Sequence, residues 1–223
     1  PTSPLSGIFT KEQAEAIADI NPDINVIMSA WGHDFTALPV RKPLVWIEKF
    51  LWALKQPKNH IRKVNGVNEV FNAQLHWNER LPFGGIQQLI NVNRKNFKAA
   101  MKQFGKMDVI HAHVSFPAGY IARELSQEFN VPYVITEHMS PFPFVTYMDG
   151  EKPRKEIIDA LNDADASIAV SPSLADRIAS FNIKKPQVIG NIVDERRFSM
   201  VKLPTDKFIF FTLGGISEQK GID

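Results

Sequence analysis

The chain has 223 residues, of which 44% are hydrophobic and 22% charged, a composition typical of globular proteins. It contains no cysteine, which excludes a disulfide scaffold, a zinc ribbon and thiol catalysis. Lys and Arg number 26 against 24 Asp and Glu, and this net charge of +2 is too balanced for a dedicated nucleic-acid binder.

Helical and strand-like patterns alternate along the chain. Thr10 and Gln13 fit a capping box at the start of a first helix, Gly105 follows a long apolar stripe as a stop, and Ser171-Pro172 fits a cap with a first-turn proline. In chain order, the patterns predict a helix over 10–18, a strand over 24–29, a helix over 44–56, a strand over 67–71, a helix over 86–104, a strand over 108–111, a helix over 118–129, a strand over 131–136, a helix over 157–164, a strand over 166–170, a helix over 171–178, and strands over 187–192 and 207–213.

The strand candidates are continuous apolar runs bounded by helices, which indicates strands buried on both faces. That pattern predicts an α/β fold with a doubly wound parallel sheet and right-handed crossovers. We expect one Rossmann-like domain over residues 1–204. Residues 205–223 would be the first strand and loop of a second, truncated domain. Because the chain opens on a loop that leads straight into a helix, we also expect the first strand of the sheet to be missing.

Polar residues gather where the predicted strands end. His111 and His113 close one strand, Thr136-Glu137-His138 closes the next, and Ser171 closes a third. In open parallel sheets, ligands bind beyond the carboxyl ends of the strands. A near-neutral imidazole can donate or accept a hydrogen bond, which suits sugar hydroxyls. His138, and with it His113, are therefore candidates for binding a polar ligand; the alternative is a structural histidine that caps a loop carbonyl.

Other readings of these residues are open. His-x-His at a strand end is also compatible with a metal hydrolase, but further ligands cannot be placed from sequence, and we expect no metal. Ser171 lacks the Gly-x-Ser-x-Gly pattern of a nucleophile and fits a helix cap better. Gly214-Gly215 ahead of Lys220 resembles a turn that could cradle a diphosphate, without matching the spacing of a P-loop.

Six segments follow one another in an order that resembles a known family. They are Ser3–Phe9, Asp108–His113 with Pro117–Gly119, Val134–His138, Ala164–Ser171, Ile189–Phe198 and Phe211–Asp223. Together they resemble the retaining family-4 glycosyltransferases of the glycosyltransferase-B fold. The resemblance implies two Rossmann-like halves around a cleft, of which the amino-terminal half binds the acceptor and the other binds most of a nucleotide-sugar donor. It also implies transfer with retention, and no cofactor.

Carried over by position, the resemblance gives roles to five residues. His138 would be catalytic, in contact with the transferred sugar. Gly7, His113 and Gly119 would bind substrate, with Gly7 near the donor phosphates or the transferred sugar, and Lys220 would contact the donor diphosphate. Gly215 stands where the family commonly has an arginine beside that lysine. Because the paired-glutamate segment of the second domain lies outside this sequence, the resemblance also predicts that the chain alone is inactive.

The segment 41–63 is strongly basic, with seven Lys and Arg against Glu48 alone. As a helix over 44–56, it would show an apolar body with Trp52 exposed among lysines. Such a helix fits an anionic membrane surface or a lipid-linked acceptor, and it fits equally a packed helix with a solvated basic face. We therefore expect a cytoplasmic protein, or one peripheral on the inner face of the membrane.

The pattern as a whole favours a hexosyltransferase-like glycosyltransferase of polysaccharide biosynthesis. It would use a nucleotide-sugar donor and a glycan or lipid-linked acceptor, and no nucleic acid. Two alternatives fit the same architecture: a nucleotide-sugar 2-epimerase, and a non-catalytic sugar-phosphate or nucleotide-binding module. The aromatic loop over 139–150 could stack on sugars or pack as a hydrophobic lid.

Overall fold

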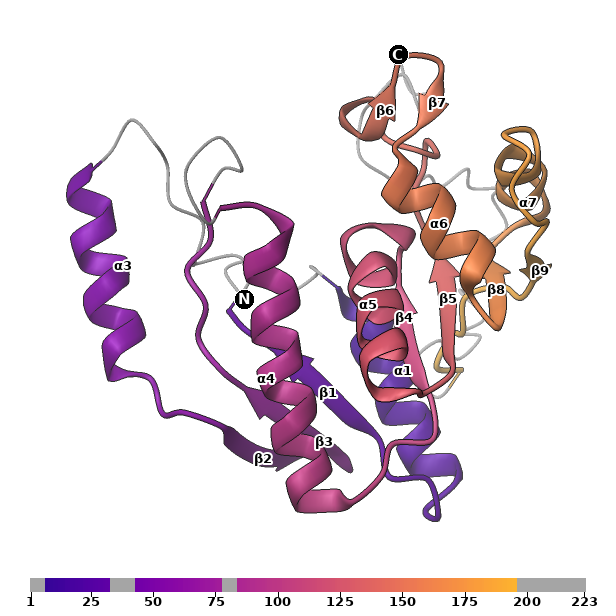
Figure 1. Ribbon diagram of the computed structural model, residues 1–223. Coiled ribbons are helices and arrows are strands. Elements are labelled where there is room, and N and C mark those ends of the chain that lie inside the picture. The colour runs from indigo at the N-terminus through magenta and orange to yellow at the C-terminus, as the bar shows by residue number, and fades with distance from the viewer. Residues whose placement is uncertain (1–6, 33–42, 78–83, 196–223) are drawn as a thin grey trace, which may run out of the picture. The chain divides into compact units, whose positions relative to one another are not determined.

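The computed structural model describes residues 7–32, 43–77 and 84–195 of the chain (Figure 1). The chain divides into a first unit, residues 1–192, and a second unit, residues 193–223, of which only 193–195 are described. The predicted strand over 207–213, the predicted break near residue 204 and Lys220 therefore lie outside the described residues.

The described residues alternate helices and strands as the sequence predicts. In chain order they form α1 (Ile8–Ile20), β1 (Ile27–Ala30), α3 (Pro43–Lys55), β2 (His60–Val64), β3 (Val67–Phe71), α4 (Ile86–Phe104), β4 (Ile110–His113), a short helical turn (Ser115–Gly119), α5 (Tyr120–Phe129), β5 (Tyr133–Glu137), a 3-10 turn (Val145–Tyr147), β6 (Met148–Asp149), β7 (Lys152–Pro153), α6 (Lys155–Asp163), β8 (Ala166–Ala169), α7 (Pro172–Ala179) and β9 (Gln187–Val188).

A four-stranded, all-parallel sheet in the order β4-β5-β8-β9 confirms the predicted α/β class. Helices α5 and α6 cover one face of this sheet (Figure 1). The core includes the fully buried side chains of Ile135 in β5, Ile157 and Leu161 in α6, and Ile178 in α7. Strand β5 lies between β4 and β8, and both neighbours run parallel to it. Its carboxyl end is therefore flanked by two strands of the same direction.

A second sheet has the order β1-β3-β2, so the parallel strands fall in two sheets rather than one. Strands β1 and β3 are parallel, whereas β2 and β3 form an antiparallel hairpin that the sequence analysis missed. Asn65 and Gly66 both have positive φ, 49° and 82°, as a two-residue hairpin turn requires. The dipeptide Asn-Gly was the available signal for this hairpin.

Helix α4 ties the two sheets together. Its Asn96 side chain donates to the carbonyl of Ala30 in β1 at 2.9 Å, and its Arg94 pairs with Glu128 of α5. The helix ends at Gly105, whose φ of 88° is costly for other residues, as the sequence predicts. These contacts make α4 the common support of both sheets.

Two predicted helix starts have different outcomes. Ser171 does cap α7, because its Oγ accepts from the backbone N–H of Leu174 at 3.2 Å. The predicted capping box at Thr10 and Gln13 is wrong: α1 begins at Ile8, and its N-cap is Gly7 with a φ of 69° and no side-chain cap. A glycine that enters the left-handed region opens the helix two residues before Thr10.

The aromatic loop after β5 is partly a packed lid. Met139 and Phe142 are buried in the main core, whereas Phe144 and Val145 are exposed. Packing therefore accounts for the first half of the loop. Among the described residues, no helix has both the length and the apolarity to span a bilayer.

Candidate functional site

His113 and His138 lie side by side at the carboxyl ends of neighbouring parallel strands. His113 ends β4 in register with Thr136 of β5, and His138 follows the last residue of β5. Nδ1 of His113 lies 3.1 Å from Nε2 of His138, and the ring centroids are 5.3 Å apart. The two candidate imidazoles are therefore direct neighbours at one edge of the sheet, while their contact with substrate stays a prediction.

Two more rings extend this pair into a row. His111, two residues before His113 on the same strand face, stacks on it with centroids 4.6 Å apart and places Nε2 2.8 Å from Thr136 Oγ1. On the other side, Phe9 of α1 stacks on His138 with a centroid distance of 4.2 Å. The sequence alone predicts no role for Phe9, because only folding brings α1 against this strand end.

The central rings are neutral at pH 7. Burial, together with smaller contributions from the neighbouring His111 and His138, lowers the pKa of His113 to about 3. Burial, then His111, lowers the pKa of His138 as well. Two neutral rings share one N–H between them, so one of their other two nitrogens is a donor and the other an acceptor. A donor and an acceptor together match a hydroxyl group.

A buried glutamate holds the backbone that carries His138. The side chain of Glu137 is fully buried, and its Oε1 accepts from the backbone N–H of His138 at 2.7 Å and of Met139 at 2.8 Å. Its Oε2 accepts from the backbone N–H of Ser115 at 2.8 Å. One carboxylate thus joins the turn after β5 to the turn after β4. The sequence signal was an acidic residue at the end of an apolar strand.

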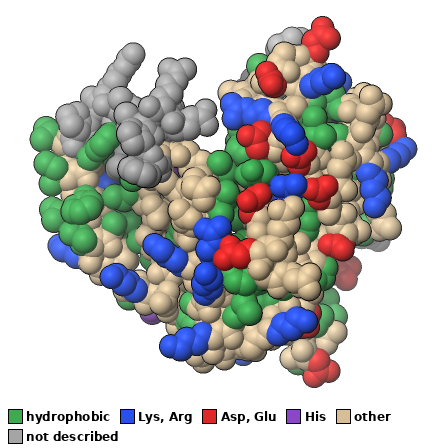
Figure 2. All heavy atoms as spheres, viewed as in Figure 1, with side chains coloured by type: hydrophobic (Ala, Val, Ile, Leu, Met, Phe, Trp, Pro, Cys, Tyr) green, Lys and Arg blue, Asp and Glu red, His purple; other side chains and the backbone are tan. Residues whose placement is uncertain are grey.

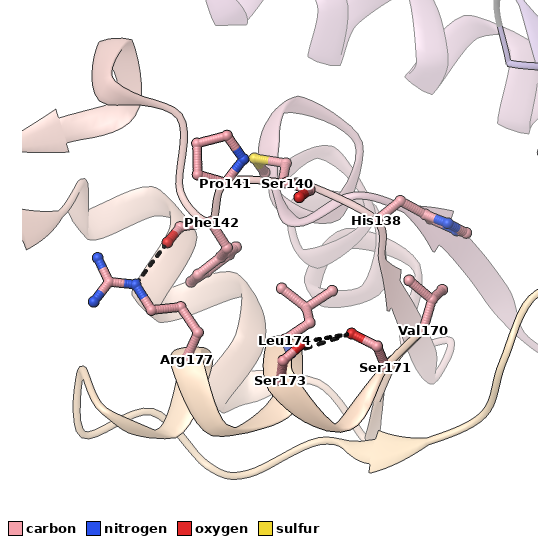
Figure 3. Close-up of a pocket in the computed structure, with 10 residues that line it drawn as sticks. His138, Ser140, Pro141, Phe142, Val170, Ser171, Ser173, Leu174 and Arg177 are labelled. Atoms are coloured by element: carbon pink, nitrogen blue, oxygen red, sulfur yellow. Dashed lines mark hydrogen bonds between the residues drawn. The ribbon is translucent and has the colours of Figure 1, made fainter. Parts of the chain in front are cut away.

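A pocket of about 310 Å³ adjoins the turn after β5 (Figure 3). Its lining includes Ser140, Phe142, Ser171 and Arg177. Arg177 is oriented by its Nε, which donates to the carbonyl of Phe142 at 3.0 Å. His138 borders this pocket, but Figure 3 shows its imidazole pointing away from Phe142 and Arg177.

A smaller pocket, of about 70 Å³, lies on the side of the ring row. Phe9, Glu12, Thr136, Ile168 and Asn191 are among the residues that line it. Glu12 and Asn191 add polar groups to a hollow that the sequence analysis did not predict. Because Phe9 and Thr136 also contact the histidines, this pocket and the imidazoles belong to one neighbourhood.

The remaining predicted site residues have separate places. Gly7 lies two residues before Phe9, at the start of α1. Gly119 is buried, and a Cβ there would lie 2.7 Å from Cδ1 of Ile135, so close packing accounts for this glycine without a ligand. Within the described ranges, no group of three or more His, Cys, Asp or Glu is placed to hold a metal ion.

The lowered histidine pKa values predict that acid destabilises the fold. Between the folded pKa of His113, about 3, and its unfolded value near 6.5, the unfolded chain binds more protons than the folded chain. The free energy of unfolding should therefore fall as the pH drops from 7 to 4. In His113→Asn this fall should be smaller, by about 1 kcal/mol at pH 5 after allowing for solvent screening of a partly exposed ring. Urea titrations at several pH values measure it, and parallel curves for the two proteins would contradict it.

Comparison with known proteins adds a family match. The model of a family described as Glycosyltransferase Family 4 matches residues 62–197, more than half of the chain. No curated protein matches the sequence significantly. Among solved structures, a sucrose-phosphate synthase from Thermosynechococcus elongatus is similar at 14% sequence identity and a TM-score of 0.40, over 73% of this chain and 86% of that one.

Proposed function

This chain belongs to glycosyltransferase family 4, and from that premise we propose that it forms the acceptor-side part of an enzyme that transfers a sugar from a nucleotide-sugar with retention. The acceptor would be a glycan or a lipid-linked glycan, as in polysaccharide biosynthesis, and the transferred group a hexose. The nucleotide-sugar is a substrate, and the proposal includes no cofactor or metal.

One observation carries the proposal: a pair of neutral imidazoles, His113 and His138, at the carboxyl edge of a parallel sheet. Such an edge is where open α/β sheets bind ligands. Neutral rings add no charge, so they suit hydroxyl groups rather than phosphates. In the proposal, both histidines contact hydroxyl groups of the transferred sugar. His138 lies nearer the reacting centre than His113 does.

The donor diphosphate needs a different kind of partner. Its charge grows as the bond to the sugar breaks, and fixed donors or cations must offset it. Gly7 opens α1 without a side-chain cap, and its carbonyl accepts from the amides of Thr10 and Lys11. In the proposal, the amides of Ile8 and Phe9, which precede this first helical hydrogen bond, face phosphate oxygens. Lys220, outside the described residues, is the proposed cation. The carboxylate of Glu12, which lines the smaller pocket, suits the acceptor side better than the phosphate side.

A donor screen tests the proposed function. The full-length protein is incubated with UDP-, GDP- and ADP-sugars, with and without glycan acceptors, and release of the nucleotide diphosphate is measured. We expect turnover of one donor class. NMR of the product should show the same anomeric configuration as in the donor. Conversion of the donor into its 2-epimer would support the epimerase instead. Absence of turnover with every donor, in a protein that is folded, would overturn the transferase.

A further inference from the structure

Helix α3 turns an apolar face to solvent. Leu44 is 80% exposed and Leu54 66%, and between them Ile47, Phe50 and Leu51 each expose half of their surface or more. Leu44, Ile47, Leu51 and Leu54 are spaced three, four and three residues apart, so they form one stripe along the helix. These five side chains, here called the α3 stripe, form a contiguous exposed apolar patch, and the largest such patch on a soluble protein is often an interaction site.

The opposite face of α3 is the less exposed one. Val45, Trp52 and Ala53 are partly buried there, and Trp52 takes part in interactions of its own. The predicted exposure of Trp52 among lysines is therefore wrong, although the predicted apolar body of the helix is present. A surface helix ordinarily buries its apolar stripe, so the exposed α3 stripe calls for something that covers it.

The segment that contains the stripe is basic. Residues 44–63 hold five Lys and Arg against Glu48, a net charge of +4. Lys55, Lys58 and Lys63 are exposed, and none of the ion pairs among the described residues includes them. Figure 2 shows hydrophobic side chains gathered over α3, with Lys and Arg side chains beside them.

We propose that the α3 stripe and these lysines dock the protein on an anionic bilayer surface. An amphipathic helix lying in the interface buries its apolar side chains about 5–10 Å into the boundary of headgroups and acyl chains. Lys55 at the end of the helix, and Lys58 and Lys63 in the segment that follows, then meet lipid phosphates. A second copy of the chain fits less well, because pairing two stripes would bring two segments of charge +4 together.

This inference does not depend on the proposed sugar transfer. Vesicle binding needs no donor and no turnover, so a failure of the docking surface leaves the donor screen unaffected, and the reverse also holds. If both stand, a lipid-linked acceptor becomes the favoured substrate class, because the enzyme would meet it at the bilayer.

Vesicle flotation tests the docking surface with the full-length protein. The probes are vesicles of phosphatidylcholine alone and vesicles with about one third phosphatidylglycerol. We expect flotation with the anionic vesicles, at least about tenfold weaker binding to the neutral ones, and weakening by salt. Absence of binding to anionic vesicles would overturn the proposal, as would equal binding to both kinds.

Two variants and a control separate the contributions. Ile47→Ser/Leu51→Ser/Leu54→Ser removes apolar contact, and Lys55→Glu/Lys58→Glu reverses the charge, so each should lower binding by about tenfold or more. Lys152→Glu/Lys184→Glu changes exposed lysines elsewhere and should bind like the unaltered protein. Equal binding by all four proteins would overturn the proposal. So would a dimer in sedimentation velocity that the serine variant dissociates while vesicle binding stays unchanged.

Discussion

Replacing His138 with alanine is expected to lower kcat of the full-length protein by about 100-fold or more on whichever donor it turns over. The reason is that a neutral ring fixed 3.1 Å from His113 by a shared N–H presents a pre-oriented hydrogen-bonding nitrogen, and alanine presents none. Initial rates over a range of donor concentrations separate kcat from KM. The circular dichroism spectrum and thermal midpoint of the variant confirm that it is folded.

Two amide variants sharpen this test. The side-chain amide of asparagine reaches about as far as Nδ1 of a histidine, and that of glutamine about as far as Nε2. Nε2 of His138 faces His113, so Nδ1 is the nitrogen left for substrate. His138→Asn should therefore retain more activity than His138→Gln. His111→Ala is the matched control, because that ring hydrogen-bonds Thr136 rather than His138. An equal loss in the control variant and in His138→Ala would remove the assigned role.

Replacing Glu137 with alanine is expected to cost the fold about 3 kcal/mol or more in free energy of unfolding. The change leaves the backbone N–H groups of Ser115, His138 and Met139 without their acceptor in a buried position, at about 1–3 kcal/mol each. Glu137→Gln should cost less than Glu137→Ala, because its amide oxygen can still accept from a backbone N–H. It should still be destabilising, because its NH₂ group would face another N–H donor. Urea unfolding at constant pH measures both.

An exposed glutamate supplies the control for that experiment. Glu151 is exposed, and Glu151→Ala should change the free energy of unfolding by less than about 0.5 kcal/mol. If Glu137→Ala were as stable as Glu151→Ala, the carboxylate would not be what holds the two turns. Since one of these hydrogen bonds positions the backbone of His138, Glu137 variants that still fold should also lose activity.

Elements with strong local patterns were predictable from the sequence. Helix α4 matches its predicted residues, 86–104. Its apolar residues have helical spacing, and the glycine that follows them is a typical residue at the end of a helix. Strand β3 matches as well, and its buried residues, Val67 and Val70, lie on opposite faces of the strand. Strand β2 was missed since its residues are mostly exposed and basic, which leaves only the Asn65-Gly66 turn as a signal.

The candidate site was predictable only where strand geometry decides it. Parallel strands end at one edge, so two histidines at neighbouring strand ends had to meet. Phe9 and Glu137 depend on other information. Phe9 reaches His138 because of where α1 packs, and Glu137 acts through backbone groups that no side-chain pattern encodes. The exposed stripe of α3 is a third case, since spacing marks an apolar face but not which face the tertiary contacts cover.

The proton shared by His113 and His138 has a consequence for selectivity. When the shared proton passes from one ring to the other, both rings stay neutral only if a second proton moves as well: the ring that gains the shared proton releases the one on its other nitrogen, and the other ring takes one up, so donor and acceptor exchange between Nε2 of His113 and Nδ1 of His138. The two rings can therefore bind a hydroxyl group whichever way its O–H bond points. They do not distinguish a hydroxyl that donates the hydrogen bond from one that accepts it. Discrimination between axial and equatorial stereoisomers must then come from the rigid walls around the rings, with Phe9 the first candidate for redesigning sugar preference.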